Sequence, residues 1–106
     1  MLQINEKTSK ISEIDFVTSP NFDDRPKSIS IDTIVIHCIS LPEGEYDNNN
    51  VIDFFQNKLD ISLNDSFKSL ENFKVSPHLF IRREGRIIQM VPFDKRAWHA
   101  GKSSYN

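Results

Sequence analysis

The sequence predicts a small domain of the α/β (α+β) class, because strand and helix patterns follow one another along a single chain of 106 residues. An apolar, β-branched run at residues 33–40 predicts a buried strand. Apolar residues at helical spacing follow at residues 51–59, and a period-two pattern surrounds a glycine-containing turn at residues 78–91. With 38% hydrophobic and 26% charged residues, the composition is that of a folded domain rather than a disordered or fibrous chain.

The N-terminal region leads up to this strand. Residues 1–15 have no sustained apolar period, so we expect a loose arm or a short helix, and we place an N-terminal arm at residues 1–18. Residues 19–21 (Ser-Pro-Asn) and 25–26 (Arg-Pro) are turn signals. Phe22, which lies between them, is expected to anchor the turn region to the core.

His37 interrupts the apolar run near its end and is the first candidate functional residue. Four of the five residues 34–38 are apolar, which is typical of a central strand covered on both faces. A strand end that opens into a loop is a common place for chemistry, so His37 is either a ligand or a satisfied core histidine. Cys38 does not form a nucleophilic pair with it, since adjacent residues of a strand point to opposite faces.

The next segment predicts a loop and two helices. Pro42 and Gly44 place a loop at residues 41–45. Residues 48–50, all asparagine, offer an N-cap for a helix of two to three turns. The apolar stripe of this helix consists of Val51, Ile52, Phe54, Phe55 and Leu59. Asp65 is a candidate cap for a second, short helix that carries Phe67 and Leu70.

A β-hairpin is predicted in the last third of the chain. Residues 78–83 and 86–91 flank a two-residue turn, Glu84-Gly85, in which glycine supplies the positive φ that tight turns need. Pro92 stops the second strand, and residues 93–105 predict a loop rich in charged and aromatic side chains.

Charge and motifs exclude several functional classes. The net charge of -2 divides into -6 over residues 1–70 and +4 over residues 71–106, so the basic part could attract an anionic ligand, although such splits are usually solvated faces. The sequence has no phosphate-binding glycine loop, nucleophile elbow or C-x-x-C pair, and its acidic balance does not fit nucleic-acid binding. It has one cysteine and no signal-like or membrane-spanning stretch, so we expect a cytoplasmic protein without nucleic-acid or membrane partners.

The three histidines raise the question of a metal site. His37, His78 and His99 lie at a strand end, a strand start and a loop, and ligands from different segments can converge in a folded sheet. The sequence has no closely spaced pair such as H-x-x-x-H. Spacing alone therefore leaves a compact three-histidine zinc site open as one alternative.

Several strings carry a resemblance to a known family: residues 19–22, 25–26, 35–42, 75–78, 81–85 and 91–101. Together they resemble the N-terminal half of the AmpD-type 1,6-anhydro-N-acetylmuramoyl-L-alanine amidases, zinc enzymes related to phage lysozyme-type amidases and peptidoglycan recognition proteins. The last string, Val-Pro-Phe-Asp-Lys-Arg-Ala-Trp-His-Ala-Gly, is eleven residues long. The resemblance implies a mixed sheet flanked by helices, truncated after the hairpin and its following loop. Residues 19–106 are then expected to form the N-terminal part of a single amidase domain.

The resemblance also implies residue roles. His37 matches the first of the family's three zinc ligands, while the other two ligands and the glutamate general base match no residue of this chain. Lys74 matches an arginine that contacts the anionic substrate, Trp98 matches an aromatic residue lining the sugar site, and Cys38 replaces an asparagine that hydrogen-bonds the substrate. A core or loop anchor remains the other interpretation of Trp98. His99 lies near the family's site without being a ligand.

By this resemblance, the parent protein hydrolyses the amide between the lactyl group and L-Ala of anhydro-muropeptides in peptidoglycan recycling. Its zinc ion would lower the pKa of bound water to about 7 and polarise the scissile carbonyl. We expect the 106-residue chain to be inactive alone, because one ligand cannot hold zinc tightly, and to be poorly stable or associating. The alternative is a non-catalytic muropeptide-binding module, and the oligomeric state is left open.

Overall fold

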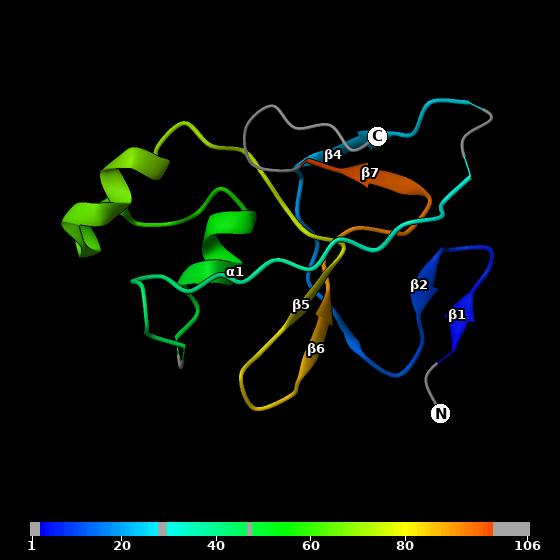
Figure 1. Cartoon of the computed structure of the whole chain (residues 1–106), viewed down its shortest axis with the longest axis horizontal. Coiled ribbons are helices and arrows are strands. Elements are labelled where there is room, and N and C mark those ends of the chain that lie inside the picture. The colour runs from blue at the N-terminus through cyan, green and yellow to red at the C-terminus, as the bar shows by residue number, and fades with distance from the viewer. Residues whose placement is uncertain (1–2, 28–29, 47, 99–106) are drawn as a thin grey trace.

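The computed structural model describes residues 3–27, 30–46 and 48–98. Within these ranges the chain forms short strands in three small sheets, one α-helix and two 3-10 helices (Figure 1). The helices lie on one side of the molecule and the sheets on the other. Helices and strands thus occur together in a mixed α+β fold, the class that the sequence predicts.

The strands pair over two or three residues each. They are β1 (Ile4–Asn5), β2 (Lys10–Ile11), β3 (Asp15–Phe16), β4 (Phe22–Asp24), β5 (Leu79–Ile81), β6 (Ile87–Gln89) and β7 (Lys95–Ala97). The pairs β1–β2 and β4–β7 are antiparallel, whereas β6 lies between β3, which is parallel to it, and β5, which is antiparallel. β7 falls inside the region predicted as a loop, so that prediction is wrong for residues 95–97.

The N-terminal region forms strands, neither the loose arm nor the short helix expected from the sequence. Gln89 of β6 holds this region through its buried side chain. Its Oε1 accepts a hydrogen bond from Ile11 N at 2.7 Å, and its Nε2 donates to Ser9 O at 3.1 Å. Strands of two residues are too short to produce a period in the sequence, and the Gln89 side chain adds two hydrogen bonds that tie their region to β6.

The predicted hairpin is confirmed, with a different turn. Ile81 pairs with Ile87, and Arg82 N donates to Arg86 O at 2.8 Å, so three residues rather than two lie inside the last hydrogen-bonded pair of the hairpin. Gly85 has φ +97°, and its N–H donates to Arg82 O at 2.9 Å. Three-residue hairpin loops place a left-handed residue last, and glycine adopts that conformation without steric cost.

The predicted first helix is present but shorter. Helix α1 (Asn50–Phe55) ends because Asn57 adopts φ +62°, and Lys58 N donates to Asp53 O at 2.7 Å across this end. At the start, Asn48 Oδ1 accepts a hydrogen bond from Asn50 N at 2.9 Å. The N-cap position itself is held by Asn49, whose side chain makes no cap hydrogen bond, so the expected asparagine cap is replaced by the bond from Asn48, one residue earlier.

Two 3-10 helices, η1 (Ile61–Leu63) and η2 (Asp65–Leu70), follow α1. The cap of η2 is Asn64, whose side chain accepts a hydrogen bond from Ser66 N at 2.9 Å, so the prediction that Asp65 is the cap is wrong by one residue. Phe67 of η2 is buried. In the described ranges, no helix has the length and apolar character needed to span a membrane.

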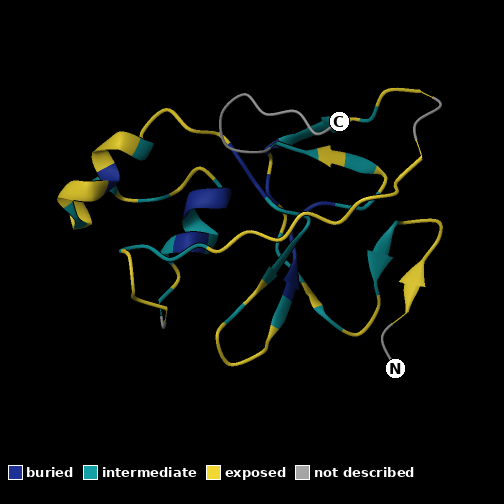
Figure 2. Ribbon diagram, viewed as in Figure 1, coloured by how far each residue is buried: buried dark blue, intermediate teal, exposed yellow. Residues whose placement is uncertain are grey.

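The core forms where α1 packs against the strand β6 and the segments beside it (Figure 2). Its buried members are Val51, Phe54, Phe55, Val75, Ile88 and Met90. Phe55 also contacts Phe80 of β5 edge to face, with ring centroids 6.3 Å apart. The apolar stripe predicted for α1 is therefore the face that enters the core.

The central strand predicted at residues 33–40 is absent from the structure. These residues cross the front of the molecule without regular secondary structure, and residues 31–38 are exposed (Figures 1 and 2). Ile34 and Ile36 are 88% and 89% exposed. A buried strand needs partners for its backbone and cover for both apolar faces, and none of the strands in the described ranges pairs with this run.

Candidate functional site

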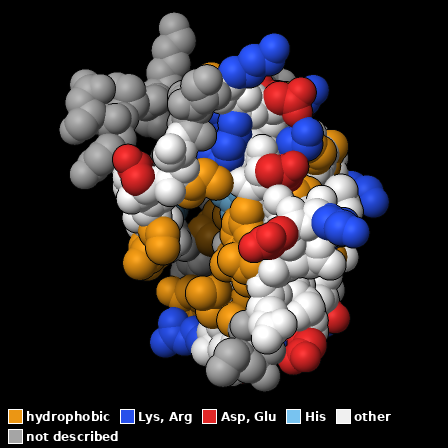
Figure 3. Space-filling view, turned by 90° about the vertical axis from the view of Figure 1, so that its right-hand side faces the viewer, with side chains coloured by type: hydrophobic (Ala, Val, Ile, Leu, Met, Phe, Trp, Pro, Cys, Tyr) orange, Lys and Arg blue, Asp and Glu red, His pale blue; other side chains and the backbone are white. Residues whose placement is uncertain are grey.

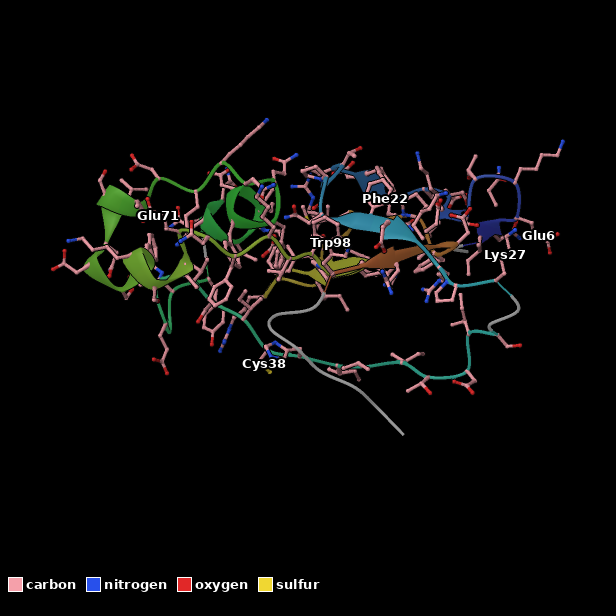
Figure 4. The ribbon with its side chains drawn as sticks, turned by 90° about the horizontal axis from the view of Figure 1, so that it is seen from above. Glu6, Phe22, Lys27, Cys38, Glu71 and Trp98 are labelled. Carbon is pink, nitrogen blue, oxygen red and sulfur yellow. The ribbon has the colours of Figure 1, made fainter. Side chains whose placement is uncertain are left out.

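His37 and Cys38 lie in the irregular segment 30–40, and both side chains are exposed. Figure 4, a view from above, shows Cys38 on this segment, which runs along one side of the molecule apart from the sheets and helices. Just after the two residues, Ile39 and Leu41 pack against the core. His37, the candidate zinc-coordinating residue, thus lies next to the point where an exposed segment joins the folded part of the molecule.

This junction is held by side-chain amides. Leu41 O accepts hydrogen bonds from Asn48 Nδ2 and Asn50 Nδ2, each at 3.1 Å. Arg82 reaches the same region from the hairpin, since its Nη2 donates to Asn48 O at 3.2 Å. Gly44 N donates to Ser40 Oγ at 2.9 Å and closes the loop between them. The end of the segment that follows His37 is therefore fixed to the start of α1 and, through Asn48, to the turn of the hairpin.

Lys74 lies on the helical side of the molecule at the edge of a cavity of about 200 Å³. The lining is mostly apolar and consists of Phe54, Asn57, Leu59, Ile61, Leu70, Glu71, Phe73 and Lys74. Lys74 and Glu71 are both exposed, so this mostly apolar cavity carries one positive and one negative side chain in its lining.

Trp98 follows β7 and is half-buried. Its backbone N–H donates to Asn21 O at 3.0 Å, and its backbone carbonyl accepts from Ser76 N at 2.9 Å. Asp23 of β4 has a lowered pKa, first because of the hydrogen bond from Arg96, with a smaller contribution from the Trp98 side chain. The Trp98 backbone is thus held between the chain that enters β4 and the chain that enters β5.

These contacts bring the segments of Lys74 and Trp98 side by side. Ser76, two residues after Lys74, donates its N–H to Trp98 O, and Asn21 Nδ2 donates to Val75 O at 2.9 Å. No hydrogen bond or ion pair joins the side chains of Cys38, Lys74 and Trp98 in the described part of the chain. The structure therefore aligns two of the predicted substrate-binding segments, and His37 and Cys38 lie on a third.

His78 has a structural environment. Its Nε2 lies 2.8 Å from Lys95 O, and because a carbonyl can only accept, this nitrogen carries the proton. Arg25 Nη2 lies 3.2 Å from the same atom, and the ring stacks on Phe93 with centroids 6.0 Å apart. Burial, opposed by the hydrogen bond to Lys95 and helped by the charge of Arg25, lowers the pKa of His78.

The described residues do not make up a zinc site. Among them, no group of three or more His, Cys, Asp or Glu side chains is arranged to hold a metal ion. His78 uses its Nε2 for the bond to Lys95, and His99 lies outside the described residues. His37 can supply one imidazole ligand, which by itself does not satisfy the tetrahedral coordination of zinc.

Two features of this region have no counterpart among the sequence predictions. Asn21 and Ser19 are buried polar residues beneath the Trp98 segment, although the turn signal at residues 19–21 marks their position.

A wide hollow of about 530 Å³ is lined by Gly44, Glu45, Tyr46, Asn48 and Arg83. The Arg83 guanidinium lies over the Tyr46 ring, 4.3 Å from its centroid.

Taken together, the fold and these side chains define a small α+β domain whose candidate groups lie in the connections outside its sheets, as in many enzymes and ligand-binding domains. The family model for N-acetylmuramoyl-L-alanine amidase matches residues 26–106, more than half of the chain. The chain belongs to this amidase family.

Named relatives agree with the family. The chain is 46% identical over 89 residues to 1,6-anhydro-N-acetylmuramyl-L-alanine amidase AmpD of Haemophilus influenzae, and 44% identical over 89 residues to that of Escherichia coli K12. Each match covers 84% of this chain but 48% and 49% of the relatives, so the chain spans about half of their length.

Solved structures of AmpD agree with the fold. The crystal structure of a selenomethionine derivative of AmpD matches with a TM-score of 0.86 and 42% identity, over 92% of this chain and 55% of that one. The solution structure of Citrobacter freundii AmpD matches with a TM-score of 0.54 and 44% identity, over 89% of this chain and 50% of that one. The amidase-like fold expected from the sequence is confirmed.

Proposed function

We propose that this chain is the first half of a zinc-dependent N-acetylmuramoyl-L-alanine amidase that hydrolyses the lactyl–L-Ala amide of anhydro-muropeptides. The observation that carries the proposal is the 46% identity, over 84% of the chain, to a relative named 1,6-anhydro-N-acetylmuramyl-L-alanine amidase. A non-catalytic muropeptide-binding module, the alternative considered from the sequence, is less favoured because the relatives reported above are all named as amidases.

In this proposal His37 is the first ligand of the zinc ion, and the remaining ligands come from residues that match the other half of the relatives. The described residues supply no group of three or more His, Cys, Asp or Glu side chains that could hold a metal ion, so we assign them no catalytic step. His37 is exposed next to a junction fixed by Leu41, a position from which an imidazole can meet ligands from another segment.

The proposed substrate contacts come from three further segments. Lys74 would place its ammonium group near the carboxylates of the stem peptide, with less directional bonding than an arginine. Trp98 would offer its indole face to a pyranose ring. Cys38 would be a weak hydrogen-bond partner for the substrate, and His99 would lie near it.

We place this activity in the cytoplasm, as part of peptidoglycan recycling. A single cysteine without an internal partner fits a reducing compartment, and the substrate class is a product of cell-wall turnover.

The test is a covalent chimera in which residues 1–106 replace the matching half of the Escherichia coli relative. We expect zinc-dependent release of the stem peptide from an anhydro-muropeptide, followed by chromatography. His37→Ala is expected to lower the rate by more than about 100-fold, because loss of a ligand costs more than loss of an outer-shell partner. Lys27→Ala, a change of an exposed cation outside the proposed site, is the matched control.

Two results would contradict the proposal. One is a folded chimera that binds zinc and does not hydrolyse the substrate, which would favour the binding-module alternative. The other is a His37→Ala chimera that keeps both its zinc stoichiometry and its rate.

A further inference from the structure

The strands β4 and β7 hold the segment of Trp98 in place. They lie side by side (Figure 1), with Asp23 directly opposite Arg96. Trp98 continues this ladder beyond the end of β7, since its backbone N–H donates to Asn21 O at 3.0 Å. The backbone of Trp98 is therefore fixed, and the direction of its ring depends on contacts of the side chain.

Asp23, Arg96 and Trp98 share one face of this ladder. Residues opposite each other in an antiparallel pair point to the same side, and residues two apart on one strand do so as well. Trp98 lies two residues after Arg96, so it is the diagonal neighbour of Asp23, a separation that a large aromatic side chain can span. Asp24 and Lys95, the next opposite pair, point to the other face.

Arg96 clamps the carboxylate of Asp23. Arg96 Nε donates to Asp23 Oδ1 at 2.7 Å, and Arg96 Nη2 donates to Asp23 Oδ2. Two parallel bonds from a planar guanidinium define the orientation of a carboxylate, which the ammonium group of Lys95 does not do for Asp24. Acidic and basic side chains lie close together elsewhere on the surface too, as Figure 3 shows for one face of the molecule. Since exposed ion pairs add little to stability, the fixed geometry of this pair is its more informative property.

The Trp98 side chain bonds to the same carboxylate. The pKa of Asp23 is lowered first by the hydrogen bond from Arg96, and a hydrogen bond from the Trp98 side chain is among the further causes. The only donor of an indole is its ring N–H. Asp23 therefore accepts from both neighbours, and the half-buried ring of Trp98 is oriented through its polar edge.

We propose that Asp23 is a positioning residue that, held by Arg96, fixes the orientation of the Trp98 indole and thereby the face that it offers to the sugar ring of the substrate. This role rests on the proposed function for the sugar and on the contacts between β4 and β7 for the orientation. A ring that is already oriented loses less rotamer entropy when a ligand binds. Asp23 is therefore expected to act on substrate binding and not on the chemical step.

The first test follows the indole itself, because Trp98 is the only tryptophan of the 106-residue chain. Its ring N–H gives a single indole signal in a proton–nitrogen correlation spectrum. Asp23→Ala is expected to speed the exchange of this proton with water by at least about tenfold, because the bond that protects it is lost. Asp24→Ala breaks the neighbouring ion pair on the other face, so it is the matched control and should leave the exchange unchanged. If Asp23→Ala does not fold, Arg96→Lys, which keeps the charge but loses the two parallel bonds, should speed the exchange by at least about threefold.

The second test measures substrate binding in the covalent chimera described above. Asp23→Ala should raise the KM and the calorimetric Kd for an anhydro-muropeptide by at least about fivefold, and it should change kcat by less than about twofold. Asp24→Ala should change none of these values.

Three results would overturn the proposal. One is indole exchange that stays as slow in Asp23→Ala, or in Arg96→Lys where the first variant does not fold, as in the unchanged chain. Another is a Kd that stays unchanged although the exchange has become faster, since Asp23 would then serve the fold alone. The third is a folded chimera that binds no muropeptide. A chimera that binds the muropeptide through Asp23 without hydrolysing it would count against the proposed function alone.

Discussion

Asn21 joins parts of the chain that are far apart in sequence. Its Nδ2 donates to Phe55 O at 3.1 Å, at the end of α1, and to Val75 O at 2.9 Å, and its carbonyl accepts from Trp98 N at 3.0 Å. Asn21 is buried, so its amide and carbonyl groups have replaced their hydrogen bonds to water with hydrogen bonds inside the protein. Asn21 therefore sets the spacing of the two segments that carry Lys74 and Trp98.

We predict that Asn21→Ala lowers the free energy of unfolding by about 1–3 kcal/mol, because Val75 O loses its donor and the Asn57 side chain loses its partner, whereas Phe55 O keeps the hydrogen bond from Ser19 Oγ. Urea denaturation followed by circular dichroism measures this loss. Asn72→Ala, at an exposed asparagine, is the control and should change the stability by less than about 0.5 kcal/mol. Equal effects of the two variants would show that the Asn21 bonds do not stabilise the fold.

His78 predicts a dependence of stability on pH. Its pKa is lowered from 6.5, mainly by burial, so the neutral ring is favoured in the folded chain. The unfolded chain then binds more protons at pH values between the folded and unfolded pKa. The stabilising contribution is complete above about pH 6.5 and is lost as the pH falls from there through the folded pKa.

The measurement is the free energy of unfolding at pH 7 and pH 5 for the unchanged chain and for His78→Gln. Glutamine does not titrate, and its amide can still donate to Lys95 O, so the variant should lose less stability between these pH values. Asp23 and Asp60 also have lowered pKa values, but from an ordinary value of 3.8, so their contributions are lost at lower pH. An equal or larger loss in His78→Gln would contradict the prediction.

At the scale of the elements, the sequence predicts well those whose partners are local. Strands β5 and β6 are connected by residues 82–86, and Gly85 identifies their turn. Helix α1 follows from its own apolar stripe and asparagine cap. In each case the residues that form the element are followed closely by the residue that ends it, Gly85 in the hairpin turn and Asn57 after α1.

Elements that depend on distant partners are predicted poorly. The run at residues 33–40 has a stronger apolar pattern than any observed strand, yet no strand in the described ranges pairs with it. Conversely, β1 and β2 have weak patterns, yet they pair with each other, and the Gln89 side chain of β6 bonds their region. A pattern reports the preference of a segment, whereas tertiary contacts decide whether that preference is met.

The candidate site divides in the same way. Composition and spacing leave His37 undecided between ligand and core residue, and its exposure removes the core interpretation for the described structure. Lys74 and Trp98 carry no pattern of their own, and their assignment comes from the resemblance to the family. The bonds of Asn21 and Ser76 that align their segments are tertiary contacts, which spacing in the sequence does not contain.

For the whole molecule, the main feature is an imbalance between a small core and an open segment. The buried hydrophobic cluster gathers around α1 and β6, while Ile34 and Ile36 are almost fully exposed. Exposed side chains contribute little to stability, since folding does not remove them from water. Changes at these two positions should therefore alter the surface of the chain without weakening its fold.

We predict that the chain alone binds the apolar dye ANS, and that the double change Ile34→Lys and Ile36→Lys lowers the dye fluorescence by at least about twofold, because dye binding reports exposed apolar surface. The far-ultraviolet circular dichroism spectrum and the urea midpoint should stay unchanged. Leu63→Lys, at an apolar side chain that is 63% exposed outside the segment, is the control and should have a smaller effect. A loss of stability in the double variant would instead mean that the two isoleucines are buried in solution, and that residues 31–38 are already covered in the isolated chain.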